Sequence, residues 1–212
     1  MEDVLEVYQR PYDPKRPVVC LDEISKTLHD TPHGILPLQP GAGVRQDYQF
    51  SRNGTVNLFM KVEPLRGWRR VTVTDHRTSL DFAQQLRSLV DEDYPEAEVI
   101  VLVTDNLNTH TPACLYEAFE PEEARRIAAK LEWHYTPEHG SWLNVAECEL
   151  SVLARQCLAR RMPDKPFIIS EVAAWEHKRN EAQVTIRWQF TTKDARIKLR
   201  RLYPVVNVQY LT

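Results

Sequence analysis

The chain has 212 residues, of which 42% are hydrophobic and 27% charged, and this composition excludes a wholly disordered chain. Its net charge of −3 at pH 7 argues, taken alone, against a protein that grips a polyanion. Its four scattered cysteines form no C-x-x-C pair, and no apolar run approaches the roughly 20 residues of a membrane span. These features predict a soluble, cytoplasmic protein with no membrane partner.

Residues 1–17 hold three prolines and predict a helical turn followed by an extended lead-in. The short apolar run at 18–21 predicts a buried strand that ends at Asp22 and Glu23. Since neighbouring residues in a strand point to opposite faces, only one of these two carboxylates can join a site on a given face.

A loop rich in proline and glycine is expected at 31–43. Asn53-Gly54 then predicts a tight hairpin turn, because this dipeptide between apolar segments is a strong hairpin signal. The paired strands would occupy 46–51 and 55–62, and a third strand is expected at 70–74.

The second half of the chain alternates helices with strands. Thr78 or Ser79 can cap an amphipathic helix that reaches Asp93. The β-branched and aliphatic run at 99–103 is typical of a strand buried on both faces of a sheet. The remaining elements are a helix from Thr111-Pro112, a helix at 121–130, a strand at 131–135, and helices from Leu143 onward. This order predicts an α/β fold with a mixed central sheet flanked by helices.

Three carboxylates stand where sheet proteins build sites. Asp22 and Asp105 each follow a predicted central strand, and Glu147 lies in the first turn of a predicted helix. If the two strands are neighbours and the helix end packs beside them, the three carboxylates repel one another. A divalent metal ion would offset that repulsion, so the pattern favours a metal site.

Each of these residues also has a structural interpretation. Asn144-x-x-Glu147 is a capping-box spacing, in which Glu147 would only bond the first turn of its helix. A single Asp after a strand is commonly a turn former, and Asp75 competes with Asp105 as a strand-end carboxylate.

A zinc site is not favoured by the seven histidines. His134 and His139 flank Pro137 and could approach His110, but structural zinc requires a tighter ligand set.

Charge is divided unevenly along the chain. Residues 1–150 carry 15 Lys and Arg against 25 Asp and Glu, and residues 151–212 carry 12 against 5, giving −10 and +7. This asymmetry points to nucleic-acid contact more than the total does, although an ordinary solvated helical surface gives the same pattern.

The most specific signal is a set of three ordered segments. They are Val18–Glu23, Val103–His110 and His139–Glu147, followed by a closing stretch at 190–204. Together they resemble the catalytic blocks and C-terminal end of DDE-type insertion-sequence transposases of the Tc/mariner-like superfamily. The resemblance covers nearly the whole chain.

The resemblance implies a ribonuclease-H-like fold in which Asp22, Asp105 and Glu147 hold two Mg²⁺ ions, with Mn²⁺ as a substitute. It implies a lead-in at 1–17, a catalytic core at 18–165 and a basic helical extension at 166–212. Family members normally carry helix-turn-helix modules ahead of this core, so we expect a catalytic domain without its recognition half.

The implied activity is metal-dependent cleavage of DNA at transposon ends and strand transfer into target DNA. The implied partners are terminal inverted repeats, target DNA and a second copy of the chain in a homodimer, in a bacterial-type cell with the protein on the nucleoid. The alternative is a catalytically incompetent fragment that binds DNA or a full-length transposase and modulates it. Residues expected to support the site or contact DNA are Asn106, His110, Trp142, Asn144, Arg155, Arg160, Arg161, Lys193, Arg196, Lys198, Arg200 and Arg201.

Overall fold

The computed structural model describes residues 1–30, 50–138 and 140–203. Their strands form one five-stranded sheet in the order β3-β2-β1-β4-β5, in which β1 to β3 are antiparallel and β4 and β5 run parallel to β1. The strands are β1 (Val18–Asp30), β2 (Ser51–Glu63), β3 (Trp68–Thr74), β4 (Ile100–Thr104) and β5 (Leu131–Tyr135). The predicted mixed α/β sheet is confirmed.

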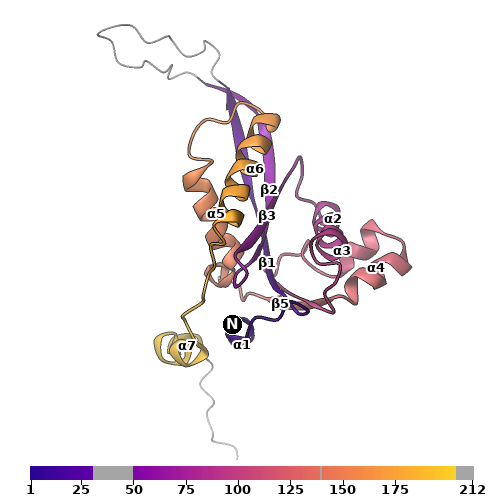
Figure 1. Cartoon of the computed structure of the whole chain (residues 1–212), viewed down its shortest axis with the longest axis vertical. Helices are drawn as coiled ribbons and strands as arrows, with labels where there is room; N and C mark the ends of the chain where they lie inside the picture. Colours follow the sequence, from indigo (N-terminus) through magenta and orange to yellow (C-terminus); the bar gives the residue numbers. More distant parts are fainter. Residues whose placement is uncertain (31–49, 139, 204–212) are drawn as a thin grey trace, which may run out of the picture.

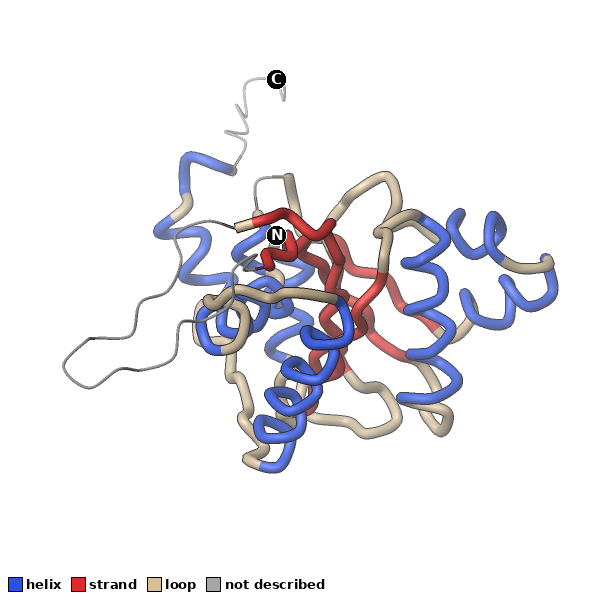
Figure 2. Tube along the Cα trace, turned by 90° about the horizontal axis from the view of Figure 1, so that it is seen from above, coloured by secondary structure: helices blue, strands red, loops and turns tan. Residues whose placement is uncertain are grey.

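Helices cover both faces of this sheet (Figures 1 and 2). On one face lie α1 (Glu2–Gln9), α5 (Val145–Gln156) and α6 (Lys165–Glu181), and on the other lie α2 (Ser79–Ser88), α3 (Ala113–Ala118) and α4 (Pro121–Ala128). The last helix, α7 (Thr192–Lys198), packs against α1. Short helical turns occupy Leu89–Asp93, Ser141–Leu143 and Arg200–Leu202.

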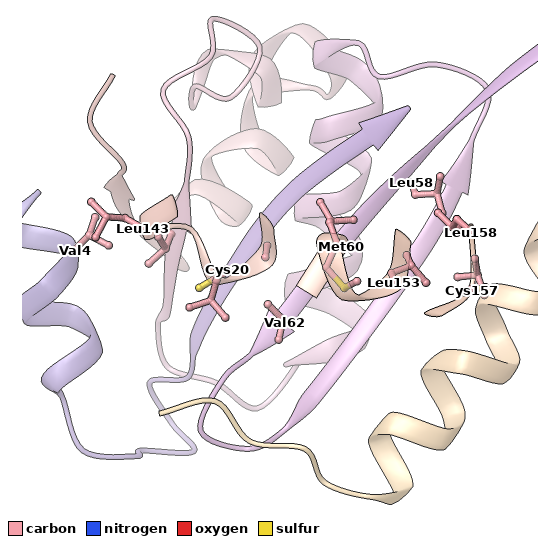
Figure 3. Packing of buried hydrophobic residues seen from close by; sticks show 14 of the residues in the cluster. Val4, Cys20, Leu58, Met60, Val62, Leu143, Leu153, Cys157 and Leu158 are labelled. Carbon is pink, nitrogen blue, oxygen red and sulfur yellow. The ribbon is translucent and has the colours of Figure 1, made fainter. Parts of the chain in front are cut away.

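Side-chain alternation along the strands divides the hydrophobic core in two. Val19 and Leu21 of β1 pack toward α2, α3 and α4, whereas Cys20 packs with Met60 and Val62 toward α1 and α5 (Figure 3). Every residue of β4 is buried, as its uninterrupted apolar sequence predicts. Both faces of the sheet are thus buried around β1 and β4, the parallel pair at its centre.

The predicted hairpin turn at Asn53-Gly54 is wrong. Both residues lie inside β2, and β1 extends to Asp30 instead of ending at Glu23. The pairing shifts there, because Leu28 alone on β1 faces Asn53 and Gly54 on β2, and Gly54 adopts a φ of +88°. A bulge accommodates a glycine with positive φ as readily as a turn does, so the dipeptide marks an irregularity without fixing its kind. The first of the two expected hairpin strands, 46–51, falls largely outside the described residues.

Most helix starts are where the caps predict them. Thr78 caps α2 and forms a capping box with Asp81, Pro121 is the first residue of α4, and Asn144 caps α5. The described part of the chain contains no helix both long and apolar enough to cross a membrane.

Polar side chains of α6 cover the outer edge of β3. Asn180 accepts from the backbone N–H of Arg69 and donates to its carbonyl, and Glu176 accepts from the N–H of Val71. After α6 the chain returns past the β2–β3 turn, where Ile186 N–H donates to Pro64. These contacts satisfy an edge that would otherwise be open to another strand.

Candidate active site

The parallel pairing of β1 with β4 places two aspartates level with each other. Cys20 of β1 pairs with Val103 of β4, so Asp22 and Asp105, two residues further along each chain, lie on the same face of the sheet. That face is the one covered by α5, which brings Glu147. Asp22 does not end its strand as predicted; it lies at the point where β4 ends and β1 continues beside β2 alone.

The carboxyl group of Asp22 is held in an unfavourable environment for a charge. Burial raises its pKa to about 7, and a hydrogen bond from the N–H of Glu23 only partly offsets that rise. The negative charges of Asp105, Glu23 and Glu147 raise the pKa further. These carboxylates therefore lie near enough to repel one another, as the sequence predicts.

Asn144 joins Asp22 to the start of α5. Its buried side chain caps the helix by accepting from the N–H of Ala146 at 3.0 Å. The same amide group donates to the carbonyl of Leu21 at 3.2 Å and to Oδ2 of Asp22 at 3.1 Å. Asn144 thus supports the candidate site from within the protein.

Glu147 does not act as the reciprocal partner of a capping box. The N–H of Asn144 donates to the carbonyl of Ser141, and Oε2 of Glu147 is buried with no hydrogen-bond partner. A buried carboxylate oxygen without a partner is costly unless something absent from the protein itself, such as a cation, satisfies it.

His110 connects Asp105 to the opposite face of the sheet. Its Nδ1 hydrogen-bonds Oδ1 of Asp105, and its Nε2 lies 3.2 Å from Oε2 of Glu23. Burial alone lowers the pKa of His110, but the hydrogen bond with Asp105 and the nearby negative charge of Glu23 outweigh it and raise the pKa to about 9. The sequence assigns no role to Glu23 here, although its alternation with Asp22 does predict that it faces the other way.

The three carboxylates are of the chemical type that binds a divalent cation. Mg²⁺ prefers carboxylate oxygens, and the crowding around Asp22 together with the unpartnered oxygen of Glu147 favours added positive charge. Among the described residues, no three His, Cys, Asp or Glu side chains stand close enough to hold a metal ion as they are. Asp22 is bonded to Asn144 and Asp105 to His110, so metal binding would require these side chains to change position.

A surface hollow lies directly beside Asp105. Asn106, which is exposed, lines it together with the segment that leads into α5. Its lining residues are Asp105, Asn106, Leu107, Thr136, Pro137, Glu138 and Ser141. The loop after β4, the loop after β5 and the helical turn before α5 therefore meet at one opening.

An aromatic cluster borders the start of α5. Trp142 is 43% exposed and stacks on Trp188 at a centroid distance of 6.2 Å, and Phe190 meets its ring edge-on at 5.6 Å. Lys198 of α7 lies over Phe190 at 5.7 Å. Trp142 thus packs against two aromatic rings and remains partly exposed, and its contact with DNA stays a prediction.

The expected basic residues fall in two separate regions. Lys193, Arg196 and Lys198 on α7, with Arg200 and Arg201 after it, lie beside α1, where Arg196 pairs with Glu2 at 2.7 Å. Arg155, Arg160 and Arg161 lie at the far end of α5, where Arg160 pairs with Glu171. They form no single basic patch.

The competing residues lie elsewhere. Asp75 is exposed and its Oδ1 pairs with Lys165 at 2.7 Å, which lowers its pKa. His134 bonds Asp3 and Glu132, away from His110, and His139 lies outside the described residues. The described histidines therefore do not assemble a zinc site.

Residues 17–168 match the DDE superfamily endonuclease family. Among solved structures, the crystal structure of the Mos1 strand transfer complex is similar at a TM-score of 0.55 with 14% sequence identity, covering 85% of this chain and 56% of that chain. The Mos1 mariner paired end complex with Mn has a TM-score of 0.36 and 16% identity, over 85% of this chain and 58% of that one. The Mos1 transposase paired-end complex with left transposon end has a TM-score of 0.32 and 15% identity, over 88% and 62%.

No curated protein matches the chain. The chain spans about 56% of the length of the Mos1 chain in the strand transfer complex, and the likeness to it is one of fold. The family match includes Asp22, Asp105 and Glu147, which the fold collects at one edge of the sheet. This chain therefore belongs to the DDE superfamily endonucleases, and its α/β fold is the ribonuclease-H-like fold of the Mos1 transposase.

Proposed function

We propose that this chain is the catalytic domain of a transposase that cleaves DNA at transposon ends and joins those ends to target DNA. The observation that carries the proposal is the level placement of Asp22 and Asp105 on neighbouring parallel strands, with Glu147 on the helix that covers them. Membership of the DDE superfamily endonucleases supports the same reaction class.

Asp22, Asp105 and Glu147 would hold two Mg²⁺ ions, or Mn²⁺ in their place. When bound, such ions activate the attacking oxygen and stabilise the leaving oxygen of a phosphodiester. The protein contributes the positions of the three carboxylates. Asn144 holds Asp22 through Oδ2, and the rigid start of α5 sets the direction of Glu147.

The surface around the carboxylates supports a DNA partner. The exposed side of Trp142 offers a stacking face for a base, and Lys198 lies on the same aromatic cluster through Phe190. The basic residues of α7 continue from this point and would contact phosphates, which position DNA without reading its sequence. Asn106 lines the hollow beside Asp105 and would contact the DNA strand that enters the site.

The finer features of the proposal are those of the family. DNA would be bound as terminal inverted repeats and as target, by a homodimer, in the cytoplasm of a bacterial-type cell. The division into a lead-in at 1–17, a core at 18–165 and a basic extension at 166–212 is likewise a proposal.

A supercoiled-plasmid nicking assay tests the reaction. We expect the chain to nick DNA with Mg²⁺ or Mn²⁺ and to lose activity with EDTA. Asp105→Asn should reduce nicking at least 100-fold, while Asp75→Asn, which changes an exposed strand-end aspartate paired with Lys165, should leave the rate unchanged. Full activity in Asp105→Asn would overturn the metal-site assignment. DNA binding without any metal-dependent nicking would favour the non-catalytic alternative.

A further inference from the structure

We propose that Glu23 and His110 are positioning residues that orient Asp105 from the opposite face of the sheet. The inference rests on the proposed metal-dependent function and goes beyond it, because it assigns a task to two side chains outside the three carboxylates. Strand β1 would then hold both aspartates of the site, Asp22 directly and Asp105 through Glu23 and His110.

The connection runs through the sheet in one line of contacts. Oε2 of Glu23 lies 3.2 Å from Nε2 of His110, and Nδ1 of the same ring hydrogen-bonds Oδ1 of Asp105. The side chains of His110 and Glu23 are 2% and 3% exposed, whereas that of Asp105 is 27% exposed. A buried pair therefore supports the partly exposed carboxylate at the surface of the site.

The imidazole ring of His110 is fixed in place by its neighbours. Phe82 of α2 stacks on it with ring centroids 4.1 Å apart and planes inclined by 22°. Oγ1 of Thr104 lies 3.5 Å from Nδ1, and the backbone N–H of His110 donates to the carbonyl of Leu107. Because the ring is packed on its face and its backbone is held in a turn, it presents Nδ1 to Asp105 in one orientation.

The two carboxylate oxygens of Asp105 differ in their contacts within the protein. His110 and the N–H of Leu107 both approach Oδ1. A carboxylate held through one oxygen can offer the other, Oδ2, to a cation without losing its support. Hydrogen bonds of this kind orient metal ligands, and their loss typically lowers metal affinity by about 10- to 100-fold.

The burial of Glu23 is explained by its contact with His110. It is a buried carboxylate, and the guanidinium of Arg77, with which it also pairs, is exposed and 3.8 Å away. Burying a carboxylate is unfavourable without close partners, so the contact with His110 accounts for the burial of Glu23.

The test is Mn²⁺ binding to the whole chain, measured by calorimetry, alongside thermal unfolding without metal. His110→Asn keeps a donor near the place of Nδ1 and loses the contact with Glu23, whereas His110→Gln keeps a donor near Nε2 and loses the contact with Asp105. We expect Mn²⁺ affinity to fall by about 10- to 100-fold in His110→Gln and by less in His110→Asn. Glu23→Gln, which keeps the shape of the side chain, should lower it by several-fold.

His134→Gln is the matched control. His134 is also a buried histidine between two carboxylates, and the hydrogen bonds of its ring are to Asp3 and Glu132 instead of to Asp105. We expect this variant to lower the unfolding temperature and leave Mn²⁺ affinity unchanged. Nicking by the His110 variants should recover at high Mn²⁺ concentration, which a loss of folded protein alone would not produce.

Asp105→Asn separates failure of this proposal from failure of the proposed function. If the wild-type chain binds no Mn²⁺, or if Asp105→Asn binds it equally well, the metal-site assignment fails and the positioning role with it. If Asp105→Asn loses binding while Glu23→Gln and both His110 variants bind like wild type, the positioning role alone is overturned. A variant too unstable to titrate is replaced by Glu23→Gln, whose unchanged affinity would contradict the proposal.

Discussion

The side-chain amide of Asn144 donates to Oδ2 of Asp22 at 3.1 Å while its oxygen caps α5 through the N–H of Ala146. One buried residue thus connects the strand that carries the first carboxylate to the helix that carries the third. The position of Glu147 relative to Asp22 is therefore determined by a contact that is independent of any bound ion.

Asn144→Asp separates the two tasks of this residue. The variant keeps the capping oxygen but replaces the amide donor with a charge that faces Asp22, so we expect α5 to remain folded and nicking to fall at least tenfold. Asn144→Ala removes both contacts and should also cost about 1–2 kcal/mol of unfolding free energy. Circular dichroism measures the helix content, urea unfolding measures the unfolding free energy, and plasmid nicking measures the activity of each variant. Wild-type nicking in Asn144→Asp would contradict the role of the amide.

Two glycines with positive φ are expected to differ in how much unfolding free energy is lost when each is replaced by alanine. Gly67, at φ +70°, lies so close to the chain after α6 that an added Cβ would meet the carbonyl carbon of Gln183 at 2.7 Å. Gly54, at φ +88°, has nothing within 4 Å of such an atom. Gly54→Ala should cost about 1 kcal/mol from backbone strain alone, and Gly67→Ala clearly more. Equal unfolding free energies for the two variants would show that the contact at Gly67 relaxes freely.

Arg69 is expected to be the most sensitive charged residue of the fold. It is fully buried on β3, its Nε lies 3.2 Å from Glu149 of α5, and its guanidinium donates to the carbonyls of Gly67, Arg179 and Val184. Arg69→Met leaves three carbonyls without this donor and removes one ion-pair partner of Glu149, which keeps its hydrogen bonds from Arg179. We therefore expect a loss of about 3–5 kcal/mol in unfolding free energy.

Arg126→Ala is the control for that substitution. Arg126 pairs with Asp91 and Glu123 on the surface, where its side chain is 45% exposed. Exposed pairs contribute about 0–1 kcal/mol, so urea unfolding should separate the two variants clearly. A loss in Arg69→Met no greater than in Arg126→Ala would refute the assignment.

The ion pair between Glu132 of β5 and Arg10, at the end of α1, is expected to make the stability of the fold depend on pH. Hydrogen bonds from Arg10 and then His134 lower the pKa of Glu132 to about 2, below its ordinary 4.5. Because the folded-state pKa is lowered, the ionised group stabilises the fold fully above about pH 5, and this contribution disappears as the pH falls toward 2. Glu132→Gln should therefore cost about 1 kcal/mol at pH 7 and almost nothing near pH 2. Acid unfolding curves of both proteins measure this difference, and a gap that widens toward low pH would contradict it.

Local sequence signals predict the centre of this molecule well. The strand over 131–135 has the predicted limits, the apolar run of β4 is buried on both faces, and the caps of α2, α4 and α5 are where side-chain chemistry indicates. Asp105 follows a strand and Glu147 lies in the first turn of a helix, which are positions that sequence marks directly, whereas Asp22 lies inside β1 where its pairing with β4 ends.

What sequence does not predict depends on partners far along the chain. The outer half of β1 is half polar and looks like a loop, because only β2 pairs with it there. Asn53-Gly54 signals positive φ but does not distinguish a bulge from a turn. Nothing in the sequence indicates that Glu23 and Arg69 are buried, because their charged partners, His110 and Glu149, are far away along the chain.

The pairing of β1 with β4 also determines when the site can form during synthesis of the chain. Asp22 and Asp105 are 83 residues apart, and Glu147 follows 42 residues later. They meet only after β4 has inserted between β1 and β5 and α5 has packed onto the sheet. Contacts over such separations form late in folding. A nascent chain that ends before Glu147 therefore lacks one of the three carboxylates, and the proposed nuclease activity would require a chain that extends through α5.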